Sequence, residues 1–133
     1  MIRNPKVFRA WMAVGLYCAL IFGLSSLSRP LPFLAPAFTP PDWVLHLGEY
    51  GILGALLADA LGVTFQFPSR FLLLLTAGLL GTLYGLSDEW HQSFVPPREA
   101  SLRDLVVDAL GIFLGAIVWL SYRHPERSEG SRF

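Results

Sequence analysis

Four long apolar runs, separated by short polar or proline-rich segments, constrain the fold of this 133-residue chain more than any other feature. Each run covers about 20 residues, the length at which a helix crosses a hydrocarbon core about 30 Å thick. The runs therefore predict an all-α fold, an integral membrane four-helix bundle formed by residues 1–123. The expected transmembrane helices span residues 8–27, 43–63, 71–91 and 102–122.

The composition supports a membrane protein and excludes other classes. Only 15% of the residues are charged, whereas a soluble domain carries roughly a quarter. The formal net charge is zero, so the chain lacks the basic excess expected of a protein that binds nucleic acid. Cys18 is the single cysteine, which excludes a disulfide framework. We expect membrane lipids as partners and no nucleic acid; the oligomeric state stays open.

The segments at the ends of the chain and between the apolar runs have compositions that predict their structure. The basic start of the chain resembles a signal peptide, but the first run is longer than a typical signal sequence and lacks a small-residue cleavage site, so we expect it to be retained. Residues 28–41 contain five prolines, which predicts an irregular segment that rests on the bundle or dips into the interface. Residues 124–133 are polar and predict a disordered cytoplasmic tail.

The basic residues predict the orientation. Seven of the ten Lys and Arg residues lie on the side that holds both termini, and only Arg29, Arg98 and Arg103 lie on the other side. The positive-inside rule then predicts a multi-pass protein of the cell (plasma) membrane with both termini in the cytoplasm. Seven of the ten acidic residues lie on the outer side, so the candidate chemistry faces outward.

Polar residues gather at the outer ends of the second, third and fourth helices, and helical spacing places them on three faces. Ionisable groups are costly in a membrane, so we expect these faces to turn toward one another, as at a functional site. The candidate catalytic residues are His46, Asp88, Glu89, His91, Asp104 and Asp108. The candidate ligand-binding residues are Asp42, Glu49, Tyr50, Gln92 and Arg98.

Several of these residues have structural alternatives. Ser101 and Asp104 fit a capping box, in which Asp104 only stabilises a helix start. Asp108 lies one turn deeper and needs a partner; Arg98 is the expected one and Arg103 the second choice. His46 or His91 alone would suit a structural hydrogen bond, but two histidines among carboxylates favour a site.

These residues resemble the motifs of the VanZ-like membrane proteins. The resemblance rests on Asp42-x3-His46-x3-Tyr50, on Asp88-Glu89-x-His91-Gln92, on Arg98, and on Asp104-x3-Asp108-x2-Gly111, about two-thirds of the chain. It implies a small polytopic membrane protein of the cell envelope, since the founding member is linked to teicoplanin resistance. The family usually carries Asn where this chain has Asp108. A function that needs an amide donor at that position is therefore in doubt for this chain.

Three function classes follow. The first is an outward-facing enzyme on a lipid-linked or peptidoglycan-related ligand, with His46 or His91 as general base, oriented by Asp88 or Glu89, and Arg98 as anion holder. A less favoured variant holds a divalent metal between His46, His91 and carboxylates. The second class is a non-catalytic envelope ligand-binding or resistance factor, and the third, least favoured, is a proton-coupled carrier.

Overall fold

The computed structural model describes residues 4–28 and 31–123 and confirms the all-helical fold. Within these ranges the chain has no β-strand, and all four long helices are long and apolar enough to cross a membrane. The elements are α1 Pro5–Ser25, the short 3₁₀ helix η1 Pro36–Phe38, α2 Asp42–Thr64, α3 Arg70–Gln92 and α4 Leu102–Arg123. The expected tail, residues 124–133, lies outside the described residues.

The largest shift from the expected helix bounds is at α1, which starts at Pro5 rather than at residue 8. Asn4 caps this helix by accepting a hydrogen bond from the backbone N–H of Lys6 at 3.0 Å. Proline at the first helical position needs no hydrogen-bond partner for its nitrogen and already has a helical φ. The polar residues before the apolar run therefore belong to the helix.

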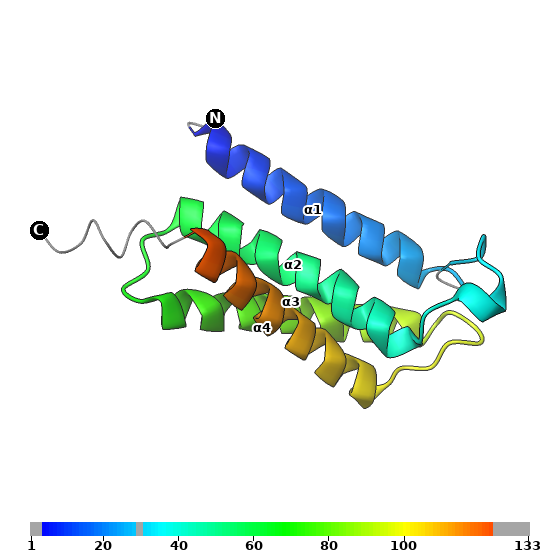
Figure 1. Ribbon diagram of the computed structural model, residues 1–133. Helices are drawn as coiled ribbons and strands as arrows, with labels where there is room; N and C mark the ends of the chain where they lie inside the picture. The colour runs from blue at the N-terminus through cyan, green and yellow to red at the C-terminus, as the bar shows by residue number, and fades with distance from the viewer. Residues whose placement is uncertain (1–3, 29–30, 124–133) are drawn as a thin grey trace, which may run out of the picture.

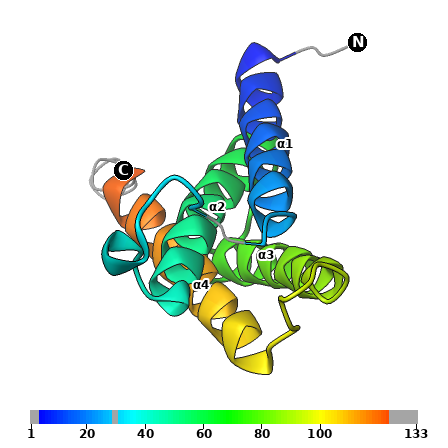
Figure 2. The same cartoon turned by 90° about the vertical axis from the view of Figure 1, so that its right-hand side faces the viewer.

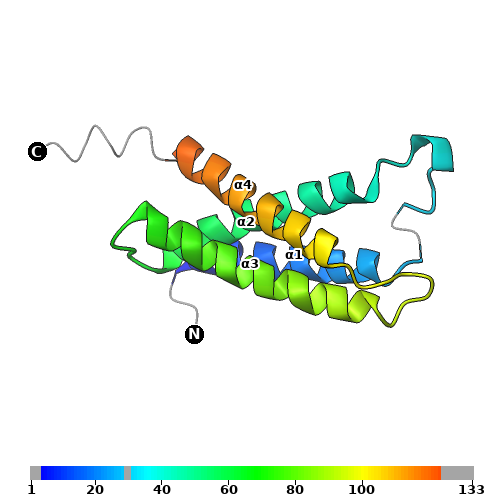
Figure 3. The same cartoon turned by 90° about the horizontal axis from the view of Figure 1, so that it is seen from below.

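Helix α2 lies at the centre of the bundle. Figure 2 shows α1 on one side of α2 and α4 on the other, while α3 runs beside both α2 and α4. The start of α1 and the end of α4 lie at one end of the bundle, as Figure 1 shows. The other end, which we call the polar end, holds the end of α1, the start of α2, the end of α3 and the start of α4 (Figures 1 and 3).

Glycines bring α2 and α4 into backbone contact. A Cβ added at Gly54 would overlap the backbone of Ile112, and one added at Gly115 would overlap the carbonyl of Gly51. At Gly111 the added atom would lie 2.8 Å from the carbonyl oxygen of Leu47. Small residues allow such close approach in membrane helices. This crossing fixes how the start of α2 faces the start of α4.

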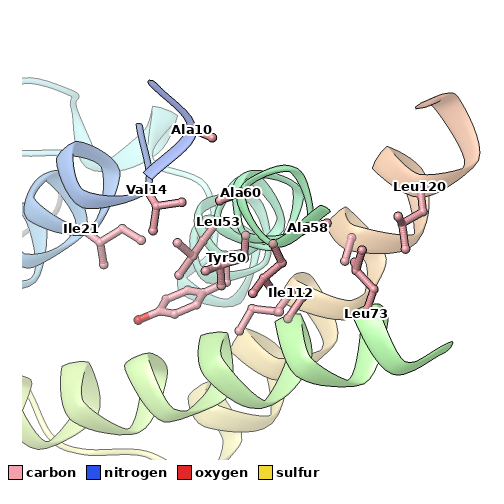
Figure 4. Packing of buried hydrophobic residues seen from close by; sticks show 14 residues of the cluster. Ala10, Val14, Ile21, Tyr50, Leu53, Ala58, Ala60, Leu73, Ile112 and Leu120 are labelled. Atoms are coloured by element: carbon pink, nitrogen blue, oxygen red, sulfur yellow. The ribbon is translucent and has the colours of Figure 1, made fainter. Parts of the chain in front are cut away.

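The interior is apolar, and so is much of the surface. Tyr50, Leu53 and Ile112 are fully buried where α2 faces α3 and α4 (Figure 4). Large hydrophobic side chains also lie exposed along all four helices, for example Leu16 at 66% and Leu79 at 60%. A soluble monomer rarely exposes so much contiguous apolar surface. This surface fits a bundle surrounded by lipid.

The proline-rich segment is irregular, as expected, except for the short η1 helix. Its aromatic side chains do not rest on the bundle, because Phe33 is 78% and Phe38 76% exposed. This exposure is consistent with the expected dip into the membrane interface. Aromatic rings favour that region.

Candidate functional site

The polar end of the bundle holds the buried polar side chains. Among the described residues, six polar or charged side chains are at least nine-tenths buried, and every one lies toward this end of its helix. They are Ser25 from α1, His46 from α2, Asp88, Glu89 and Gln92 from α3, and Asp108 from α4. The sequence therefore folds so that all four helices contribute to one polar cluster.

His46 and Asp108 form the closest pair in the cluster. The His46 Nδ1 atom lies 2.7 Å from Asp108 Oδ1, and the Asp108 side chain is fully buried. The other ring nitrogen, Nε2, lies 3.7 Å from Oδ2 of Asp42, which is largely exposed. A carboxylate on one ring nitrogen fixes the orientation and tautomer of an imidazole. Asp108 thus holds His46 with Nε2 on the solvent side.

The position of Asp108 depends on a glycine of α3. A Cβ added at Gly85 would lie 3.3 Å from Asp108 Oδ2 and 3.3 Å from the ring of Tyr50. A contact of that length is tighter than ordinary carbon contacts. Gly85 therefore leaves the room that the buried carboxylate occupies between α2 and α3.

Asp88 lies in a second hydrogen-bonded group. Its Oδ2 atom accepts hydrogen bonds from the Tyr50 hydroxyl at 2.9 Å and from Gln92 Nε2 at 3.0 Å. Gln92 also donates to the Ser25 hydroxyl at 3.4 Å. This group connects α1, α2 and α3, and in it Tyr50 and Gln92 hold the Asp88 carboxylate.

Glu89 and Asp104 share contacts with the start of α4. The backbone N–H of Ser101 donates to Glu89 Oε2 at 2.9 Å. The Ser101 hydroxyl accepts from the backbone N–H of Asp104 at 3.3 Å, which is the N-cap contact expected from the sequence. Glu89 therefore ties the end of α3 to the loop before α4.

Three buried carboxylate oxygens have no hydrogen-bond partner in the described structure: Asp88 Oδ1, Glu89 Oε1 and Asp108 Oδ2. Two groups of side chains have the composition and spacing to hold a metal ion. One consists of His46, Glu89 and Asp108, and the other of Asp42, His46 and Asp104. In each group the donor atoms lie within 4.8 Å of one another.

A small open pocket lies over this cluster, with about 230 Å³ of space free of protein atoms, part of which is open solvent. Its wall combines apolar and polar side chains from three helices and the loop after α3. The lining residues are Leu24, Ser25, Asp42, Leu45, His46, Glu49, Gln92 and Arg98. Arg98 Nη1 donates to the Ser25 carbonyl at 3.4 Å, and this bond holds the guanidinium at the pocket.

The structure brings most of the expected site residues together but changes two contacts. His91 does not join His46, because its Nε2 lies 2.9 Å from the Ser26 hydroxyl and its ring stacks on Phe22 at 4.3 Å. The expected pairing of Arg98 with Asp108 is not found either, since Asp108 pairs with His46. Arg103, the second choice, is exposed.

The part that α1 plays in the site was not expected from the sequence. Leu24 and Ser25 line the pocket, although the end of the first apolar run carries no charge to draw attention to it. The signal that could have indicated it is the position of Ser25, which ends an apolar run on the same side of the membrane as His46. Missing too was the ion pair between Arg123 and Asp59 at the opposite end of the bundle, 3.4 Å long.

Comparison with known families supports the resemblance seen in the motifs. The model of the family described as VanZ/LLP1 matches residues 10–123. The match includes α1 from residue 10 onward, all of α2, α3 and α4, and every residue of the polar cluster. Neither the curated proteins nor the solved structures give a match.

Proposed function

This chain belongs to the VanZ/LLP1 family, and from that premise we propose that it acts at the cell envelope on a lipid-linked or peptidoglycan-related ligand, which it binds in the pocket at the polar end. The positive-inside distribution of Lys and Arg supports a topology with this end outside the plasma membrane and both termini in the cytoplasm. The pocket then faces the compartment in which peptidoglycan is built.

The observation that carries the proposal is the His46–Asp108 pair beneath the pocket. Asp108 accepts from Nδ1–H and leaves Nε2 on the pocket side, where it can take a proton from a ligand hydroxyl or a water molecule. The same division of roles between carboxylate and imidazole operates in hydrolases of unrelated folds. His46 is therefore the residue that we assign to the reacting group, and Asp108 positions it.

Arg98 supplies the charge that selects the ligand. A guanidinium has five N–H donors in a planar fork, and the bond to the Ser25 carbonyl uses one of them. The remaining donors suit a phosphate or a carboxylate. Leu24 and Leu45 provide the apolar part of the wall, which suits a ligand that carries a lipid.

The buried carboxylates also favour a second candidate, a non-catalytic binding or resistance factor. Asp88 and Glu89 hold other parts of the bundle through Tyr50, Gln92 and the Ser101 backbone. A protein of this kind needs His46 only as a hydrogen-bonding group. The variant His46→Gln keeps hydrogen bonding and removes the base, so it separates the two candidates.

Teicoplanin susceptibility in cells that express the protein tests the proposal. We expect the wild type to raise the inhibitory concentration, and His46→Ala and Arg98→Ala to return it to the level of cells without the protein. His91→Ala is the matched control, because His91 contacts Ser26 and Phe22 outside the pocket. Equal membrane levels of all variants are required, measured by blotting an epitope tag.

Two results would contradict the proposal. If His46→Ala and Arg98→Ala protect cells as well as the wild type, the pocket is not the functional site. The orientation has its own test, in which Glu99→Cys is placed in a Cys18→Ala background. We expect a membrane-impermeant maleimide to label this cysteine in intact cells, and labelling only after lysis would show that the polar end faces the cytoplasm.

A further inference from the structure

The buried cluster contains three metal-type donors from three different helices. His46 on α2, Glu89 on α3 and Asp108 on α4 each bring a donor atom within 4.8 Å of the other two. All three side chains are buried, and Asp108 is fully inaccessible. Divalent transition metals are bound by such sets of imidazole and carboxylate donors.

Buried carboxylate oxygens that lack a hydrogen-bond partner in the protein point to a bound ligand. Glu89 Oε1 and Asp108 Oδ2 are buried without a hydrogen-bond partner, although the other oxygen of each carboxylate is bonded. A buried carboxylate oxygen without a partner is costly. Two in one donor set are suited to a bound cation.

The neighbouring cationic side chains do not bond these oxygens. Arg98 donates to the Ser25 carbonyl at the pocket, and Arg103 at the start of α4 is exposed. His46 already contacts Asp108 Oδ1 through Nδ1, so it does not satisfy Oδ2 or Glu89 Oε1. A dication would balance the two carboxylates of the set.

We propose that His46, Glu89 and Asp108 bind one divalent transition metal ion of the zinc or manganese type. The imidazole favours such an ion over calcium or magnesium. The surroundings supply outer contacts of the kind that orient metal ligands, because Asp42 lies 3.7 Å from His46 Nε2 and the Ser101 N–H binds Glu89 Oε2. The burial of all three donors makes this an enclosed site.

The proposed effect of the metal on the mechanism rests on the proposed function. The binding of the metal does not. An ion that takes His46 Nδ1 displaces the Nδ1–H···Asp108 hydrogen bond of the proposed function, and the ring proton then lies on Nε2. The metal-bound protein then has a fixed donor for an anionic ligand group but no free imidazole base. Metal occupancy therefore decides between the catalytic and the non-catalytic candidate.

Metal analysis of the full chain purified in detergent tests the site. After removal of metal with EDTA and dialysis against Zn²⁺ or Mn²⁺, we expect about one ion per chain of the wild type by mass spectrometry of the metal content. Glu89→Gln and Asp108→Asn each remove one donor, and we expect each to weaken binding about tenfold or more. Glu99→Gln and His91→Ala are the matched controls and keep the ion.

The wild type alone provides a readout that does not depend on the folding of the variants. A metal that binds only the folded state raises the thermal unfolding midpoint in proportion to the logarithm of its concentration. We expect this rise with Zn²⁺ or Mn²⁺, and its reversal by EDTA. No retained ion and no rise, or an equal ion content in the donor variants and in Glu99→Gln, would overturn the site.

Different experimental results would overturn the metal site and the proposed function. If the purified wild type binds no metal while His46→Ala still abolishes protection against teicoplanin, the metal site is wrong and the proposed function stands. If the metal binds as expected while His46→Ala and Arg98→Ala protect cells normally, the site is a metal centre and the proposed function is wrong.

Discussion

Replacement of Gly54 by alanine tests the close crossing of α2 and α4, on which the polar site depends. The added Cβ would overlap the carbonyl oxygen, carbon and Cα of Ile112. These are backbone atoms on both sides, so no side chain can rotate away and the two helices must separate. Overpacking in a packed interior costs about 1–3 kcal/mol. Because rotamer changes cannot relieve this overlap, we expect Gly54→Ala to lower the free energy of unfolding by about 3 kcal/mol.

Gly48 provides a control on the same helix. No atom lies within 4 Å of a Cβ added there, so Gly48→Ala makes no clash. Alanine is favoured over glycine in a helix by about 0.8–1 kcal/mol, so this variant should be neutral or more stable than the wild type. The two variants should therefore differ by about 3–4 kcal/mol, more than 100-fold in the folding equilibrium constant.

The measurement is the free energy of unfolding in mixed micelles, followed by circular dichroism as the SDS fraction rises. We expect Gly54→Ala to unfold at a lower SDS fraction than the wild type, and Gly48→Ala at the same or a higher one. Unfolding of both variants at the same SDS fraction would refute the backbone contact between α2 and α4. The arrangement of His46 opposite Asp108 would then lose its support.

The same unfolding measurement tests three further contacts. Tyr50→Phe removes the donor to Asp88 and should cost about 1–2 kcal/mol; an unchanged midpoint would mean that this hydrogen bond does not stabilise the bundle. Ser101→Ala removes the N-cap of α4 and should cost about 1 kcal/mol, and Ser101→Asp, which keeps an acceptor, should restore most of it. Arg123→Ala breaks the ion pair with Asp59, but the arginine side chain is 59% exposed, so we expect less than about 1 kcal/mol; a larger loss would contradict a weak, solvent-screened pair.

The helices were predictable from the sequence because the signal for each is local. A run of about 20 apolar residues needs no knowledge of its neighbours to be assigned to a membrane span. The end of α3 also followed from local pattern, since the polar residues from Ser87 onward mark the approach to the interface. The start of α1 was less accurate, because Asn4 and Pro5 form a cap in a stretch that hydropathy alone assigns to solvent.

The faces of the polar residues were predictable, but their partners were not. Helical spacing places His46 and Asp108 at the same end of the bundle, yet it does not give the rotation of α2 against α4. That rotation depends on backbone contacts at Gly51, Gly54 and Gly115. The sequence argument therefore assigned Arg98 to Asp108 by charge, whereas the crossing brings His46 there instead.

The side-chain hydrogen bonds of α1 have a consequence for biosynthesis. Trp11 donates to Thr64 and Tyr17 to the Glu49 carbonyl, both on α2, while Tyr84 of α3 donates to the Cys18 carbonyl. The ribosome makes α1 before α2 and α3, so these three hydrogen bonds form only after the later helices have left the ribosome. The pocket wall that Ser25 contributes is therefore complete only once α2 and α3 pack against α1.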